Sequence, residues 1–166
     1  PTHTYAMSLL AEIANRLGYF DDAEFLLEKA VEFEPKDGAL RMKYASILRK
    51  KQKFSKTMEQ VDILCDQYPD NLSYRAQKAS ETMQNGEHQK AIDILDEILK
   101  KNPYNFSSLT SRGHAQKTLG KTNEAINSYQ SAYKIKPDHG EAFFSLANLK
   151  TDSFTKNELD SMREQV

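Results

Sequence analysis

All five prolines of this 166-residue chain are separated by one constant interval. Each lies 34 residues after the one before it, at Pro1, Pro35, Pro69, Pro103 and Pro137. Random placement would very rarely give this spacing, and proline ends helices because its ring clashes with the preceding turn. The chain is therefore predicted to be an array of 34-residue repeats, with blocks 4–37, 38–71, 72–105 and 106–139 and a partial fifth block, 140–166.

The aligned blocks agree in side-chain size at two further positions, counted from the first residue of each block. Position 8 carries Ala11, Ala45, Ala79, Gly113 and Ala147, and position 20 carries Ala23, Thr57, Ala91 and Ala125. Small side chains let two helices approach closely, and the residues around them are expected to fill the space between the helices. Those filling residues are Leu10, Leu27, Ala30, Tyr44, Leu48, Val61, Leu64, Leu95, Ile98, Tyr129 and Ala132.

Helix signals predict two helices per block. Gly18, Gly86 and Gly120 share the column between the two helices, where a left-handed cap is needed, and Gln52 holds it in the second block. Asp21 followed by Glu24 is typical of a capping box at the start of a second helix. The predicted pairs are 4–17/21–34, 38–51/55–68, 72–85/88–101 and 106–119/122–135.

Composition narrows the classes of function. With 39% apolar and 28% charged residues, a single large core is not expected, whereas a solenoid needs only a narrow apolar stripe in each segment. A net charge of −1 argues against nucleic acid or an anionic membrane as partner, and no run of 18 apolar residues predicts a membrane span. The single Cys65 favours a reducing compartment, so a cytoplasmic location is expected. The start at Pro1 rather than Met suggests a fragment.

These columns resemble the tetratricopeptide repeat (TPR) family, with small residues at positions 8 and 20, a large one at 24 and proline at 32. The resemblance implies an all-α, right-handed superhelical solenoid that binds another polypeptide and has no catalytic site. Position 4, usually aromatic in the family, holds Met7, Arg41, Arg75 and Leu109, and Lys78 occupies a normally apolar column. Packing is expected to be weaker at these positions.

The C-terminal stretch 140–162 carries a second resemblance, to the junction of bacterial TPR-sulfotransferase fusions. Residues 145–151 (SLANLKT) match one block of that junction, and Phe154, Glu158, Leu159 and Met162 match the helix that follows it. A capping helix is predicted from about Thr155, because Thr155 and Glu158 have capping-box spacing. The resemblance implies a sulfotransferase domain after Val166 that uses phosphoadenosine phosphosulfate; no cofactor is expected in this fragment. A free-standing TPR adaptor is the alternative.

The TPR resemblance also implies where a partner would bind, because in that family the first helix of each pair lines the concave face. Short polar side chains dominate these positions, leaving room for an extended peptide. The main groove candidates are Tyr5, Glu12, Arg16, Met42, Lys43, Ser46, Arg49, Lys50, Gln77, Ser80, Ser111 and His114, with Ser8 and Asn15 in the same columns. The basic run 49–56 is interpreted either as a solvated turn or as a surface that steers acidic peptides.

Other chemistries are not favoured by the sequence. Gly120, Lys121 and Thr122 imitate a phosphate loop, but the motif needs glycine where Ala115 stands. The four histidines lie in scattered positions and predict no metal site. The carboxylates of Asp21, Asp22, Asp93, Asp96 and Glu97 are expected on solvated helix faces. The two-carboxylate clamp of chaperone-binding TPRs and the asparagine ladder of sugar-transferring TPR enzymes lack their residues here.

Overall fold

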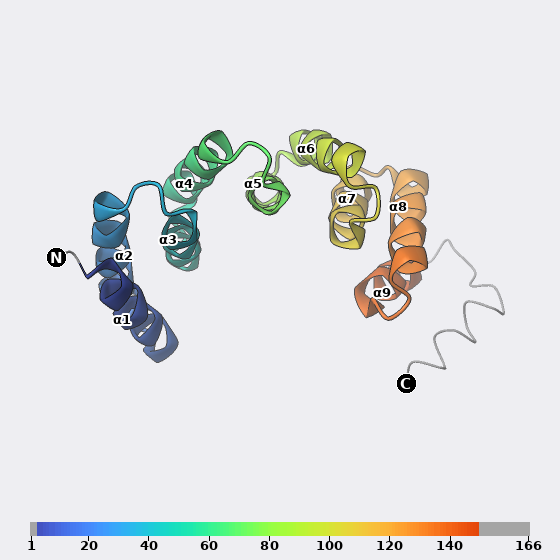
Figure 1. Cartoon of the computed structure of the whole chain (residues 1–166). Coiled ribbons are helices and arrows are strands. Elements are labelled where there is room, and N and C mark those ends of the chain that lie inside the picture. Colours follow the sequence, from blue (N-terminus) through green and yellow to red (C-terminus); the bar gives the residue numbers. More distant parts are fainter. Residues whose placement is uncertain (1–2, 150–166) are drawn as a thin grey trace. The chain divides into compact units, whose positions relative to one another are not determined.

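The computed structural model describes residues 3–149, which form nine helices and no strand (Figure 1). In chain order they are α1 (Thr4–Leu17), α2 (Phe20–Phe33), α3 (Gly38–Lys50), α4 (Phe54–Gln67), α5 (Leu72–Gln84), α6 (His88–Lys101), α7 (Phe106–Thr118), α8 (Thr122–Ile135) and α9 (Gly140–Asn148). The ends of α1–α8 lie within one residue of the predicted ranges. The predicted capping helix and the junction residues after Leu149 lie outside the described residues.

The turns inside the helix pairs have the predicted left-handed backbone. Gly18, Gly86 and Gly120 have φ values of 84°, 82° and 74°, and Gln52 has 57°. Only glycine adopts this conformation without a steric cost from Cβ, so Gln52 is the least favourable of the four. Pro35, Pro69, Pro103 and Pro137 each follow the end of a second helix by two residues, where the lack of a backbone N–H breaks no helical hydrogen bond.

The residues at repeat position 34, which the sequence analysis did not identify as caps, cap the N-terminus of the first helix in three pairs. The side chains of Asp37, Asn71 and Asn105, all at position 34, accept hydrogen bonds from backbone N–H groups of α3, α5 and α7. These bonds satisfy donors that a helix start otherwise leaves unpaired.

The capping box predicted at Asp21 and Glu24 is wrong. The residue before α2 is Tyr19, and no side chain caps this helix. Asp21 bonds to Lys51, and Glu24 bonds to Lys51 and Lys53 instead. Both carboxylates bind the lysines that follow α3, because these lysines lie against α2, and neither accepts from the backbone N–H groups at the start of α2.

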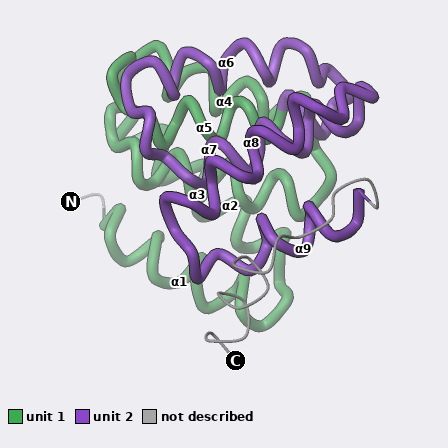
Figure 2. Tube along the Cα trace, turned by 90° about the vertical axis from the view of Figure 1, so that its right-hand side faces the viewer, with its two compact units in different colours: residues 1–81 green, residues 82–166 purple. Residues whose placement is uncertain are grey.

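The chain divides into two compact units, residues 1–81 and 82–166 (Figure 2). In the first unit one buried cluster is built from α1, α2 and α3 and includes Ala11, Leu27, Ala30, Tyr44 and Leu48, and Val61 and Leu64 of α4 are also fully buried. In the second unit one cluster joins Leu99, Leu109, Ala132 and Ala142, and another joins Ala125, Tyr129 and Leu146. The small residues at positions 8 and 20 of the four full repeats are thus buried, as predicted, whereas Ala147, at position 8 of the fifth block, is exposed.

Leu10 is the exception among the predicted filling residues, because its side chain is 54% exposed. Leu10 occupies position 7 of its repeat. In later repeats this position faces the second helix of the preceding pair, and no helix precedes α1 among the described residues.

The arginines at position 4 replace the family's aromatic residue in a specific way. Arg41 is buried, and it donates to the carbonyl of Pro35 at 2.9 Å and to Gln60 Oε1 at 2.6 Å. Arg75 donates to the carbonyl of Pro69 at 3.0 Å. Burial lowers the pKa of Arg41. Each arginine therefore bonds the proline that ends the preceding repeat, so position 4 joins neighbouring repeats despite the lost aromatic ring.

Candidate functional site

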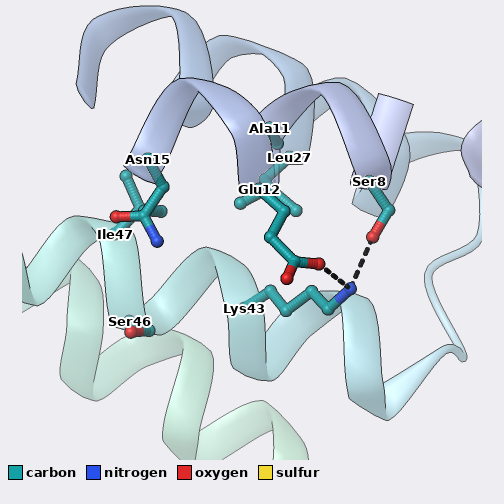
Figure 3. Close-up of a pocket in the computed structure, with 8 residues that line it drawn as sticks. All are labelled: Ser8, Ala11, Glu12, Asn15, Leu27, Lys43, Ser46 and Ile47. Carbon is teal, nitrogen blue, oxygen red and sulfur yellow. Dashed lines mark hydrogen bonds and ion pairs between the residues drawn. The ribbon is translucent and has the colours of Figure 1, made fainter. Parts of the chain in front are cut away.

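A pocket of about 260 Å³ opens between α1 and α3 in the first unit. Ala11, Leu27 and Ile47 give it an apolar wall, and the polar side chains of Ser8, Glu12, Asn15, Lys43 and Ser46 surround them (Figure 3). Three of the predicted groove residues, Glu12, Lys43 and Ser46, are therefore brought together. Apolar contact with a few convergent polar groups is what ligand sites require.

Polar contacts hold the rim of the pocket in place. Lys43 reaches across from α3, where its Nζ donates to Ser8 Oγ at 2.8 Å and lies 3.9 Å from Glu12 Oε2 (Figure 3). Glu12 also accepts from Arg16 at 2.9 Å, one helical turn further along α1. The half-exposed Glu12 carboxylate is thus close to two cations, Lys43 and Arg16.

The remaining groove candidates of the first unit continue these contacts between first helices. Lys50 donates to Asn15 Oδ1 at 2.7 Å, and Arg49 donates to Glu81 Oε1 at 3.0 Å. Gln77 also donates to Glu81, whose side chain is buried on α5. Tyr5 is exposed at the start of α1, and Met42 and Ser80 are half-buried on α3 and α5.

Ser111 and His114 lie on α7 in the second unit and belong to a separate set of contacts. His114 Nδ1 is 2.9 Å from Tyr129 Oη, and its Nε2 is 3.1 Å from Glu141 Oε1. Burial raises the pKa of Tyr129 to about 12, so its phenol stays protonated at neutral pH. His114 therefore links α7 to both α8 and α9, and Ser111 is half-buried.

The basic run 49–56 is not a set of unpaired cations. Arg49 pairs with Glu81, and Lys51 and Lys53 pair with Glu24 of α2. Hydrogen bonding and the positive charge of these lysines hold the pKa of Glu24 below its usual value although burial alone would raise it. Because neighbouring carboxylates offset these charges, the run binds adjacent helices together, and its capacity to steer an acidic peptide is reduced.

Sequence reasoning identified the rim of the pocket but not its apolar wall. Leu27 was assigned only to packing inside its own helix pair, and Ile47 was not singled out. Ile47 is the tenth residue of its repeat, and the corresponding residues Ile13, Glu81 and Ala115 share no chemistry that would signal a ligand wall.

Two further findings concern residues 3–149. No helix in this range is long and apolar enough to cross a bilayer. No group of three or more histidine, cysteine, aspartate or glutamate side chains in the same range is arranged to hold a metal ion.

Comparison with protein families agrees with the repeat architecture. Residues 16–98 match the family model described as anaphase-promoting complex, cyclosome, subunit 3, and residues 106–139 match the model described as tetratricopeptide repeat. The chain belongs to the tetratricopeptide repeat family.

A curated relative extends the similarity to a much larger protein. The chain is 28% identical over 123 residues to a probable UDP-N-acetylglucosamine–peptide N-acetylglucosaminyltransferase SPINDLY of Hordeum vulgare. The match covers 74% of this chain but 13% of the relative. It therefore concerns a small part of that protein.

Solved structures of MamA are similar in fold. The structure titled MamA 41-end from Desulfovibrio magneticus RS-1 has a TM-score of 0.78 at 14% identity, covering 99% of this chain and 94% of the other. A MamA RS-1 double mutant gives 0.79 at 14% identity, with coverage of 99% and 93%. At this identity the likeness shows the fold alone: an all-α helical repeat solenoid.

Proposed function

We propose that this chain is a non-catalytic protein-interaction domain that holds an extended polypeptide at the pocket between α1 and α3. The observation that carries the proposal is the combination of an apolar wall with the Ser8, Glu12 and Lys43 rim. Hydroxyl, carboxylate and ammonium groups can bond a peptide backbone, while Leu27 and Ile47 can contact one of its apolar side chains. Little side-chain entropy is lost, because the long rim residues are already held by each other.

The test uses peptides selected for binding to the chain from a random display library. Ser46→Tyr should place a ring in the pocket and weaken the selected peptides, measured by fluorescence anisotropy. Ser55→Tyr, at an exposed serine of α4 outside the pocket, is the matched control and should bind like the parent. If both variants bind equally well, the pocket is not the peptide site.

The finer hypothesis is that the chain presents a polypeptide substrate to a sulfotransferase domain that follows it. It rests on the resemblance of residues 140–162 to a sulfotransferase junction. The curated relative is instead named as a peptide glycosyltransferase, so a different transferase domain is a second possibility for the larger protein. Sequencing the gene downstream of Val166 distinguishes these from a free-standing adaptor, which would have no catalytic domain there.

The cofactor expectation follows from the same hypothesis. A donor such as phosphoadenosine phosphosulfate is expected to bind only to a downstream domain, since the sequence of this chain contains no glycine-containing phosphate-loop pattern. Calorimetry of this chain with the donor should therefore show no heat of binding. A cytoplasmic site of action remains a prediction from the single Cys65.

A further inference from the structure

One pair of repeat positions joins the first repeat to the second, the second to the third and the third to the fourth. A carboxylate at position 25, on the second helix of one repeat, contacts a donor at position 7, on the first helix of the next. The pairs are Glu28 with Tyr44 Oη at 3.1 Å, Asp62 with Lys78 Nζ at 2.7 Å, and Asp96 with Arg112 Nη1 at 2.7 Å. The two residues of each pair are 16 positions apart in the sequence. In all three pairs a carboxylate on the second helix lies opposite a hydrogen-bond donor on the helix packed against it.

The last described junction is apolar instead. Position 7 is Leu146 on α9, and position 25 of the repeat before it is the uncharged Gln130. Leu146 is buried against Ala125 and Tyr129 of α8. An apolar residue at position 7 is thus covered by a helix without an acid at position 25.

The first helix presents the same positions without a cover among the described residues. In α1, Leu10, Ile13 and Leu17 occupy positions 7, 10 and 14, and their exposed fractions are 54%, 54% and 65%. The corresponding Tyr44 and Ile47 of α3 are 5% and 3% exposed, against α2. Leu10 and Ile13 are therefore uncovered among the described residues at positions that the second repeat buries. Leu17 continues the same apolar face, although its position is also exposed at Asn85 and Leu119.

This face lies away from the candidate peptide site. Successive residues of an α-helix are separated by about 100°, so Leu10 lies about 200° around the axis from Ser8. Ser8 and Glu12 line the pocket between α1 and α3, whereas Leu10, Ile13 and Leu17 lie on the opposite side of α1. The two surfaces can therefore be tested separately.

We propose that the α1 face formed by Leu10, Ile13 and Leu17 is a docking surface for an amphipathic helix. Like α8, which carries the uncharged Gln130 at position 25, this helix would present an uncharged residue to Leu10. Continuity with the packing of α2 on α3, α6 on α7 and α8 on α9 supports a helix as the occupant. A helix with an acid at position 25, such as Glu28 of α2 or Asp96 of α6, would bury its carboxylate against Leu10 without a hydrogen-bond donor, at a cost in free energy. A helix with an uncharged residue there, as in α8, avoids that cost.

The probe is a fluorescein-labelled synthetic peptide of residues 121–137, held helical by a staple between positions 127 and 131, which are exposed in α8. Fluorescence anisotropy with the whole chain should show saturable binding. Leu10→Lys should weaken it about tenfold, because an unpaired ammonium group would be buried in the interface. Phe144→Lys, at an exposed apolar residue of α9, is the control and should bind like the parent.

A charge exchange makes the test specific. A peptide carrying Gln130→Asp should bind the parent chain weakly and the Leu10→Lys chain better, because the exchange recreates the Asp62–Lys78 pair. Circular dichroism should show the parent's helix content in both variants.

Three outcomes would overturn the proposal: no saturable binding, equal binding by parent and Leu10→Lys, or no recovery on charge exchange. Sedimentation of the chain without peptide is the fourth measurement. Self-association that Leu10→Lys abolishes would assign the face to a second copy of the chain and would also overturn it.

Discussion

Gly113 differs from its counterparts because of the residue it meets on the neighbouring helix. Position 8 is alanine in the first three repeats, where position 24 is Leu27, Val61 or Leu95. In the fourth repeat position 24 is Tyr129, which is fully buried, and a Cβ on Gly113 would lie 2.5 Å from its ring. The smaller residue and the larger one therefore compensate across the same helix contact.

Gly113→Ala should lower the free energy of unfolding by about 1–3 kcal/mol, because the added methyl group overpacks the contact with Tyr129. Chemical denaturation followed by circular dichroism measures this. Adding Tyr129→Leu should recover part of the loss by restoring the pairing of the other repeats. Gly140→Ala is the control, since its Cβ would meet nothing within 4 Å. Equal effects of the two glycine substitutions would show that the ring contact is unimportant.

At the scale of helices, charged side chains connect α2 to the residues that follow α3. Glu24 is the centre of this contact, with a side chain only 11% exposed and bonds to both Lys51 and Lys53. Its pKa is lowered, although burial acts in the opposite direction, because the lysines stabilise the ionised form. A lowered pKa means that the contact stabilises the fold above the ordinary value of 4.5 and that this stabilisation is lost as the pH falls below it.

Glu24→Gln should therefore be less stable than the parent at pH 7, and the difference should shrink as the pH falls through and below 4.5. Denaturation midpoints of both proteins across this range provide the measurement. Asp22→Asn, on the exposed side of α2, should change stability by less than about 0.5 kcal/mol at pH 7. A constant difference between parent and Glu24→Gln at every pH would contradict the ion-pair explanation.

At the scale of the whole molecule, each of the two units contains its own buried clusters. Stability in repeat arrays is approximately a sum of repeat terms and contacts between neighbours. Damage to one repeat should consequently remain local, and its reach can be measured by hydrogen exchange.

Ala91→Leu provides this test, because Ala91 is fully buried at position 20 of α6. Overpacking should cost about 1–3 kcal/mol. Amide exchange should accelerate in α6 and the adjoining helices, while the amides of α1–α3 exchange as in the parent. Unchanged stability would show that position 20 is not a close helix contact, and faster exchange everywhere would show that the array unfolds as a single unit.

The sequence alone determined the helices and most of the core. Helix ends depend on local chemistry, such as the 34-residue proline spacing and the glycines in left-handed turns, and the small columns repeat with the same period. The N-caps at position 34, such as Asp37, also depend on local chemistry, but the sequence pattern was interpreted as a capping box at Asp21 instead.

Only the tertiary structure decided what each exposed-looking side chain contacts. Asp96 was interpreted as solvated but pairs with Arg112, Lys78 was expected to weaken packing but pairs with Asp62, and Leu10 was placed in the core but is exposed. The wall of the pocket likewise combines Leu27 of one repeat with Ile47 of the next. These contacts join residues 16 or more positions apart, and helix packing rather than local preference brings such residues together.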